Sequence, residues 1–315
     1  MDLLDSFRGC LLGGAVGDAL GMPTEGYTAE EIGLLFGPVR DMQPAPEGHF
    51  HTGLEAGQFT DDTEETLLLA ESLIEASGFS AERFAEKLIE WGTAWTLDER
   101  LNRGVGFTTR SAVESLIAGK PWQESGLAIP TCGSAMRAAP IGLLFHCDID
   151  LVGRYADLQS LPTHTASAAR AGSVAVATAV ALSMQGFPRM MVLRRAAEKA
   201  RLIDWDFSEK LLSIESLLDI DPGEALRTIG TSPLASETVP AAFYCFLLSD
   251  PEEALITAAS SGGDTDSIAS IAGLLFGAGC GSGWIPDRWL SPLEQKARIE
   301  TKARGLLDLN RSLCG

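Results

Sequence analysis

The sequence predicts an all-α protein, and two observations carry that prediction. Helix-start signals recur along the chain: a capping box begins at Thr28, a cap precedes an amphipathic pattern at Ser80, and prolines suited to a first turn stand at Pro222 and Pro251. Alternating strand patterns bounded by Asn-Gly or Asp-Gly turns are nearly absent. The start and stop rules together give roughly a dozen helices.

Small residues collect inside several of these expected helices, at residues 11–21, 168–182 and 268–279. Glycine in a helix interior costs about 1 kcal/mol relative to alanine, so the clusters indicate helices whose backbones approach closely or that crowd a site. No low-complexity linker or fixed-period repeat divides the chain, and we expect residues 1–315 to form a single domain. The longest irregular stretch, residues 37–59, predicts a loop of a length that is often functional.

Charge and cysteine usage exclude several classes of protein. The formal net charge of −19 repels phosphate backbones and anionic lipid, which disfavours nucleic-acid and membrane partners. The six cysteines are scattered without a C-x-x-C pair, and the acidic start MDLLDSFRGC does not resemble a secretion signal. We therefore expect reduced thiols and a cytoplasmic location. The most apolar segment, residues 172–184, is shorter than the roughly 20 residues of a membrane span and predicts a core helix.

Two acidic segments of the same form lie far apart in the sequence: GQFTDDTEETLLL from Gly57 and GGDTDSIASIAGLL from Gly262. Either alone is explained by helix capping, because acids in a first turn stabilise a helix by about 0.3 to 1 kcal/mol each. Four aspartates brought together at buried helix ends would instead need two divalent cations to balance them. Ligands that are all oxygen select Mg²⁺, Mn²⁺ or Ca²⁺ over zinc. The sequence thus predicts a pair of hard cations, provided that the fold brings the two segments together.

Other candidate groups are weaker when each is taken alone. Glu25 follows a proline in GDALGMPTEGY, and a lone loop glutamate is usually a solvated surface group. The segments 102–109 and 131–142 offer backbone N–H groups and hydroxyls suited to sugar or phosphate oxygens. His164 precedes a buried-looking helix, where a single histidine is more often a capping or packed residue than a catalyst.

Two further histidines and three common motifs give no function. His49 and His51 share a loop, and two histidines are too few to indicate a metal site. GCGSGW at 279–284 follows a helix instead of a strand, and neither a P-loop nor a G-x-S-x-G motif occurs. Hydride transfer and P-loop hydrolysis are therefore poorly supported.

Taken in order, several segments resemble the ADP-ribosylglycohydrolase family, whose members include the dinitrogenase reductase-activating glycohydrolase. They are FRGCLLGGAVGDALGMPTEG, GQFTDDTEETLLL, NRGVGFTTRSAV, CGSAMRAAPIGLLF, THTASAARAG and SGGDTDSIASIAGLLFGAGCGSGWIPDRW, from about residue 7 to 289. The resemblance implies an all-α orthogonal helical bundle in one domain, with two Mg²⁺ or Mn²⁺ ions in a central cleft. It also implies cleavage of the glycosidic bond at the 1″ carbon of ADP-ribose, in an ADP-ribosylated protein or a small ADP-ribosyl compound.

The resemblance assigns roles to residues at matching positions. The implied metal ligands are Thr60, Asp61, Asp62, Asp264, Asp266 and Ser267, the last standing where relatives often have threonine. Proton transfer would fall to Asp62, Glu25 or Asp61. The implied lining of the ADP-ribose cleft is Gly104, Gly106, Cys132, Gly133, Ser134 and His164.

One departure from the family pattern concerns substrate choice. Many relatives read Gly-Asn-Gly where this chain reads Thr131, Cys132 and Gly133, so a weakly bonding thiol replaces an amide. Arginine N-glycosides are favoured as substrate, while serine O-glycosides and small ADP-ribosyl compounds stay open. Two alternatives are a non-catalytic relative that binds ADP-ribose or a nucleotide sugar, and a magnesium-dependent all-α prenyl-diphosphate enzyme. The latter would use DDTEE as a DDxxE motif and predicts a deep aromatic-lined cavity.

Overall fold

The computed structural model describes residues 2–314, and within that range the chain forms helices joined by loops, with isolated β-bridges but no β-strands. The α-helices are α1 (Leu3–Gly21), α2 (Ala29–Leu35), α3 (Asp61–Glu75), α4 (Ala81–Leu97), α5 (Phe107–Ile117), α6 (Trp122–Ser125), α7 (Gly133–Met136), α8 (Ala139–Leu144), α9 (Ile149–Ser160), α10 (Ser167–Met184), α11 (Arg189–Ala200), α12 (Trp205–Ser213), α13 (Pro222–Ile229), α14 (Ala235–Leu247), α15 (Pro251–Ala259), α16 (Thr265–Cys280), α17 (Asp287–Leu290) and α18 (Lys296–Cys314). Three 3₁₀ turns complete them: η1 (Met22–Thr24), η2 (Glu99–Leu101) and η3 (Ile214–Leu217). The all-α prediction is confirmed.

The expected helix starts are found where the local signals place them. Thr28 and Glu31 form a capping box at α2, and the Ser80 side chain accepts a hydrogen bond from the N–H of Arg83 at α4. Pro222 and Pro251 occupy the first turns of α13 and α15. These boundaries were predictable because each signal acts within four residues of chain.

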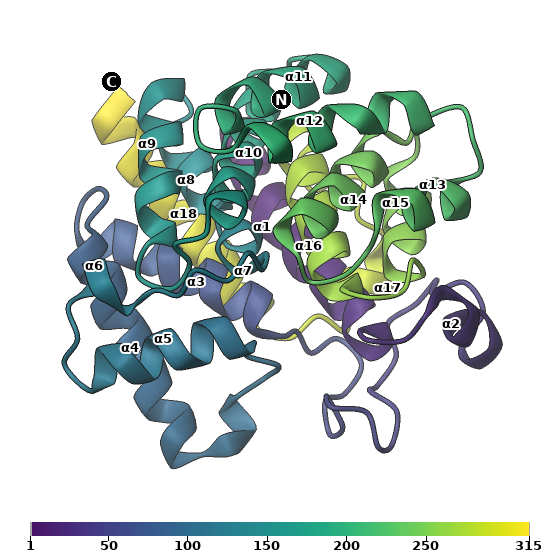
Figure 1. The fold of residues 1–315 in the computed structure, drawn as a ribbon, viewed down its shortest axis with the longest axis horizontal. Helices are drawn as coiled ribbons and strands as arrows, with labels where there is room; N and C mark the ends of the chain where they lie inside the picture. Colours follow the sequence, from purple (N-terminus) through teal and green to yellow (C-terminus); the bar gives the residue numbers. More distant parts are fainter. Residues whose placement is uncertain (1, 315) are drawn as a thin grey trace.

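Helix α1 crosses the middle of the molecule and packs against α16 and α18 (Figure 1). Its pairing with α16 is antiparallel, and glycines recur at every fourth position of the contact face. The facing pairs are Gly9 with Gly277, Gly13 with Gly273, Gly17 with Ala269 and Gly21 with Thr265. A β-carbon added at Gly13 or Gly273 would overlap the backbone of the opposite helix. The two helices are therefore in backbone contact, which confirms the close approach predicted from their small residues.

Helix α10 is long and apolar, and it lies inside the domain. It is long and apolar enough to cross a membrane by length and composition, but 78% of it is buried within the protein. Its neighbours are α7, α8, α9, α11, α14 and α16. This burial confirms the prediction of a core helix over residues 172–184.

The predicted long loop separates α2 from α3. Residues 37–59 contain no helix, and they are held by local hydrogen bonds such as that from the N–H of Ala45 to the carbonyl of Leu54 at 2.9 Å. His49 and His51 are both buried within this loop. The loop therefore belongs to the packed part of the domain.

Candidate active site

The two acidic segments meet at the amino-terminal ends of α3 and α16. The hydroxyl of Ser267 donates to Oδ2 of Asp62 at 3.3 Å, and the hydroxyl oxygen of Thr60 lies 3.3 Å from Oδ2 of Asp266. Thr60 is the N-cap of α3 and Asp264 that of α16. The fold thus supplies the proximity on which the cation prediction depended.

A cavity of about 300 Å³ opens where these helix ends meet. The predicted site residues that line it are Glu25, Asp61, Asp62, Gly104, Gly106, Cys132, Gly133, His164, Asp264, Asp266 and Ser267. Thr60 lies behind the cavity wall, in contact with Asp266. Ser134 was expected in the lining but is fully buried outside it, because its hydroxyl donates to the carbonyl of Ala169 at 3.2 Å.

The carboxyl groups of the cavity have little to neutralise them. Burial raises the pKa of Asp61, Asp62, Asp264, Asp266 and Glu25, and repulsion between the acids raises most of these pKa values further. Across residues 2–314, no lysine or arginine forms an ion pair with any of them, and the one histidine that contacts them is His51, 2.6 Å from Glu25. Such a group of buried acids is stable only with cations or bound protons.

The donor atoms present fit hard divalent cations. One oxygen of Asp62, Oδ1, is buried without a hydrogen-bond partner, and the residues around it offer carboxylate and hydroxyl oxygens. An unpartnered buried carboxylate oxygen beside further carboxylates fits the ligand preference of Mg²⁺ or Mn²⁺. Asp266 belongs to a second possible grouping, since one ligand atom each of Asp266, Glu25 and His51 lie within 4.8 Å of one another.

Asp18, on α1, anchors the first turn of α3. Its Oδ1 accepts from the backbone N–H and the hydroxyl of Thr60, both at 2.9 Å, and its Oδ2 accepts from the same groups of Thr63 at 3.0 and 2.6 Å. With both oxygens used in this way, Asp18 is a support for the ligands and not a further ligand. Its partners lie more than forty residues away (42 and 45) and give no local signal in the sequence.

Glu25 is held at the cavity by the two histidines of the long loop, and sequence reasoning missed this arrangement. Nε2 of His51 lies 2.6 Å from Oε2 of Glu25, and Nε2 of His49 lies 2.7 Å from the backbone carbonyl oxygen of Glu25. Burial lowers the pKa of His51 to about 4 and also lowers that of His49. The length of the loop was the signal available, because histidine spacing alone does not indicate a carboxylate partner.

Cys132 and His164 also line the cavity. The thiol of Cys132 donates to Oδ2 of Asp264 at 3.1 Å and lies 3.6 Å from the hydroxyl oxygen of Ser267. Nε2 of His164 is hydrogen-bonded to the hydroxyl of Thr131 at 3.0 Å, and burial lowers the pKa of His164 to about 3. The departure from Gly-Asn-Gly therefore touches two of the implied metal ligands.

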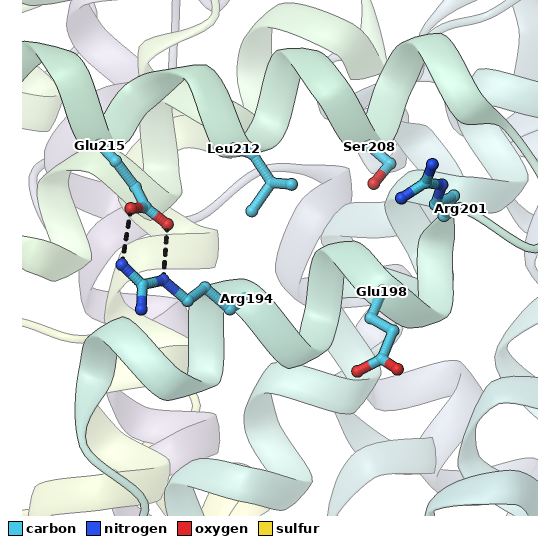
Figure 2. Close-up of a pocket in the computed structure, with 6 residues that line it drawn as sticks. All are labelled: Arg194, Glu198, Arg201, Ser208, Leu212 and Glu215. Atoms are coloured by element: carbon cyan, nitrogen blue, oxygen red, sulfur yellow. Dashed lines mark hydrogen bonds and ion pairs between the residues drawn. The ribbon is translucent and has the colours of Figure 1, made fainter.

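A second cavity lies elsewhere, between α11 and the region of α12 and η3, and is larger at about 420 Å³. Figure 2 shows the guanidinium of Arg194 paired with Glu215 across it, through two hydrogen bonds of 2.9 Å each. Glu198 pairs with Arg195 outside the lining, and the cavity shares no residue with the acidic cavity. We therefore place the chemistry in the smaller cavity.

The lining of the acidic cavity also bears on the prenyl-diphosphate alternative. Phe107 and His164 are its aromatic-ring residues, whereas that alternative calls for a deep aromatic wall. No basic side chain is part of the lining, so nothing there pairs with a diphosphate directly. The geometry does not match the alternative.

Comparison with known proteins gives one consistent result. The sequence profile of the ADP-ribosylglycohydrolase family matches residues 1–314. The chain is 30% identical to the ADP-ribosylhydrolase ARH3 of Homo sapiens, over 96% of this chain and 93% of that protein. It is 31% identical to the ADP-ribosylarginine hydrolase Tri1 of Serratia proteamaculans, over 96% of this chain and 79% of that protein. A solved structure described as an ADP-ribosylglycohydrolase-related protein complex matches with a TM-score of 0.76 and 29% identity, covering 98% of this chain and 99% of that one.

Proposed function

The chain belongs to the ADP-ribosylglycohydrolase family, and we propose that it is a hydrolase that uses two divalent cations to cleave ADP-ribose from arginine side chains of proteins. The arginine linkage is supported by the similarity to Tri1, which is named for that activity. The similarity to ARH3, named for ADP-ribosyl hydrolysis without a stated linkage, supports the reaction class. The observation that carries the cation requirement is the unpartnered Oδ1 of Asp62 among buried acids.

The six residues of the two acidic segments would hold the cations, which are Mg²⁺ or Mn²⁺ in this proposal. When bound, these ions would neutralise the aspartates and favour an orientation of the ribose hydroxyls that exposes the anomeric carbon to water. The chain contributes the rigidity of the site. Asp18 fixes the first turn of α3 through Thr60 and Thr63, and the backbone contact between α1 and α16 fixes Asp18 relative to Asp266.

Glu25 is the group that we expect to move the proton. The buried aspartates are at most 7% exposed, whereas the Glu25 side chain is 21% exposed and can exchange its proton with water. Cleavage through an oxocarbenium-like state requires a carboxyl group near the scissile bond that gives or takes a proton. Asp62 is the other candidate, since it lines the same cavity with one oxygen free.

Other residues of the cavity lining would hold the nucleotide. Gly104, Gly106 and Gly133 allow the substrate to approach the backbone closely, and the hydroxyl of Thr131 faces the same cavity. His164 stays uncharged at neutral pH because burial lowers its pKa to about 3. An uncharged imidazole can donate one hydrogen bond and accept another, which suits ribose hydroxyls.

Release of free ADP-ribose from arginine-ADP-ribosylated protein tests the proposal directly. We expect turnover with Mn²⁺ or Mg²⁺, loss of turnover after chelation, and much slower release from a matched serine-linked peptide. Asp264→Asn should abolish turnover while the helical circular dichroism spectrum is unchanged. Tight ADP-ribose binding by the metal-loaded chain without release from either substrate would favour the non-catalytic alternative.

A further inference from the structure

The segment that carries Glu25 is fixed on one side by the loop before α16. The N–H of Gly26 donates to the carbonyl of Gly263 at 2.7 Å, and the N–H of Gly263 donates to the carbonyl of Tyr27 at 2.8 Å. Gly263 has φ of +73°, a conformation that favours glycine, and it directly precedes Asp264. The backbone of the Glu25 segment is thereby tied to a candidate metal ligand, but these bonds leave the Glu25 carboxylate itself free to turn.

The other side of Glu25 faces the long loop, and here the hydrogen bonds define the state of each imidazole ring. The backbone N–H of His51 donates to Nδ1 of His49 at 3.2 Å, so Nδ1 of His49 is an acceptor. The proton of a neutral His49 ring must then lie on Nε2, where it is donated to the carbonyl of Glu25. His51 in turn presents its Nε2 to the Glu25 carboxylate, an acceptor, at 2.6 Å.

The two rings are themselves held in place by their surroundings. His49 stacks between Tyr27 and Phe50, with ring centroids 5.3 and 4.3 Å away. His51 is 3% exposed, and its ring fills the space beside Gly104, where a β-carbon would overlap Cε1 of the imidazole. Neither ring can turn away from Glu25 without moving its neighbours.

We propose that His49 and His51 form a clamp that orients the Glu25 carboxylate toward the cavity, His51 being the positioning residue for the carboxylate and His49 for its backbone. This inference rests on the proposed function of Glu25 in proton transfer. It makes the long loop part of the active site and assigns a role to histidines that do not themselves contact the substrate. A rotating Glu25 would present its oxygen at the correct angle only part of the time, so kcat would fall while substrate binding was retained.

Substitution of His51 tests the clamp. His51→Ala should lower kcat by about tenfold to hundredfold, within the range of general acid–base contributions, and change KM by less than about threefold. His51→Gln should recover part of the loss, because its amide N–H can reach the same carboxylate. Thr52→Ala removes a hydrogen bond to the Pro46 carbonyl within the same loop and serves as the matched control, with kcat unchanged.

Two further readouts separate a clamp from other roles. In a Glu25→Gln background, His51→Ala should change kcat by less than about twofold, because its effect acts through Glu25. Isothermal titration of Mn²⁺ should give the same affinity for wild type and His51→Ala. A weakened Mn²⁺ affinity, or equal losses of kcat with Glu25 or Gln at position 25, would overturn the proposal and identify His51 as a metal ligand or a general structural residue.

A measurement without turnover keeps the clamp testable if the proposed reaction is wrong. In nitrogen-15 NMR, the Nε2 proton of His51 should be protected from exchange in the wild type and exposed in Glu25→Ala. A wild type that is inactive on every ADP-ribosyl substrate but shows this protection would refute the proposed function and retain the clamp. Rapid exchange in the wild type would refute the clamp whatever the activity.

Discussion

Asp266→Asn should stabilise the protein when metal is absent and destabilise it, relative to wild type, when metal is present. An oxygen of Asp266 lies within 4.8 Å of an oxygen of Glu25, which at an effective dielectric constant of about 20 corresponds to a repulsion of about 3 kcal/mol. The asparagine amide removes this charge and keeps an acceptor for the backbone N–H of Ser267, which in the wild type donates to Oδ1 of Asp266 at 2.9 Å. In EDTA at pH 8 we expect Tm to rise by up to about 6 °C, at roughly 2 °C for each kcal/mol in a domain of this size.

Added Mn²⁺ should raise the Tm of the wild type above that of Asp266→Asn. At a Mn²⁺ concentration about 1,000 times the Kd, binding stabilises the wild type by about 4.1 kcal/mol, or roughly 8 °C, which exceeds the advantage of the variant in EDTA. The variant gains little because it has lost a proposed ligand. Differential scanning fluorimetry with and without EDTA measures both values. A variant that is destabilised equally with and without metal would refute the reasoning, because Asp266 would then act as a structural acceptor.

The pH dependence of the stability of the metal-free protein is an independent test of the repulsion between Asp266 and Glu25. The pKa of Asp266 is raised in the folded protein well above its ordinary value of 3.8 by burial and by the charge of Glu25, so the folded metal-free protein binds more protons than the unfolded chain. Its stability must therefore fall as the pH rises from about 4 through the folded pKa, and the advantage of Asp266→Asn must shrink as the pH is lowered. Mn²⁺ should remove most of this dependence in the wild type.

Three other substitutions test separate parts of the site. Cys132→Asn should restore an amide at the cavity wall and change the Kd of ADP-ribose, measured by calorimetry, by more than about threefold while kcat still depends on metal; no change in Kd would place the thiol outside the binding surface. Gly104→Ala forces a side chain against His51 at φ of +86°, so kcat should fall at least about tenfold with Tm lowered by only a few degrees, and an unchanged kcat would show that the loop yields freely. Arg137→Ala leaves the carboxylate of Glu65, on α3, buried and unpaired, because both side chains of the Arg137–Glu65 ion pair are 0% exposed. Chemical denaturation should show that the free energy of unfolding falls by about 3 to 5 kcal/mol, and a fall below about 1 kcal/mol would contradict this.

The helical class and the acidic candidate residues were predictable because their signals are local. Caps at Thr28 and Ser80 act within one turn, and the repeated form of the two acidic segments is visible without a structure. Partners across the chain were not predictable. Small residues indicated that some backbone approached closely, but nothing in the glycines of α1 named α16 as the neighbour or fixed the register between them.

The site residues that were missed or misplaced share the same physical cause. His49 and His51 look unremarkable in sequence because the residue that both contact, Glu25, lies more than twenty residues away (24 and 26) in another loop. Ser134 adjoins the cavity residue Gly133, but helix geometry turns its hydroxyl to the carbonyl of Ala169. Proximity along the chain therefore did not predict which residues of α7 face the cavity.

The glycine contact between α1 and α16 also constrains the order of events during biosynthesis. Helix α1 leaves the ribosome long before α16, whose facing backbone at Gly273 and Gly277 is encoded more than 250 residues later. Until α16 emerges, the contact face of α1 stays uncovered, which favours transient association with chaperones and slow, late closure of the domain. The proposed cation ligands also come from two distant parts of the chain, residues 60–62 and 264–267. A truncated or stalled chain therefore has no complete site, and metal can stabilise only the finished fold.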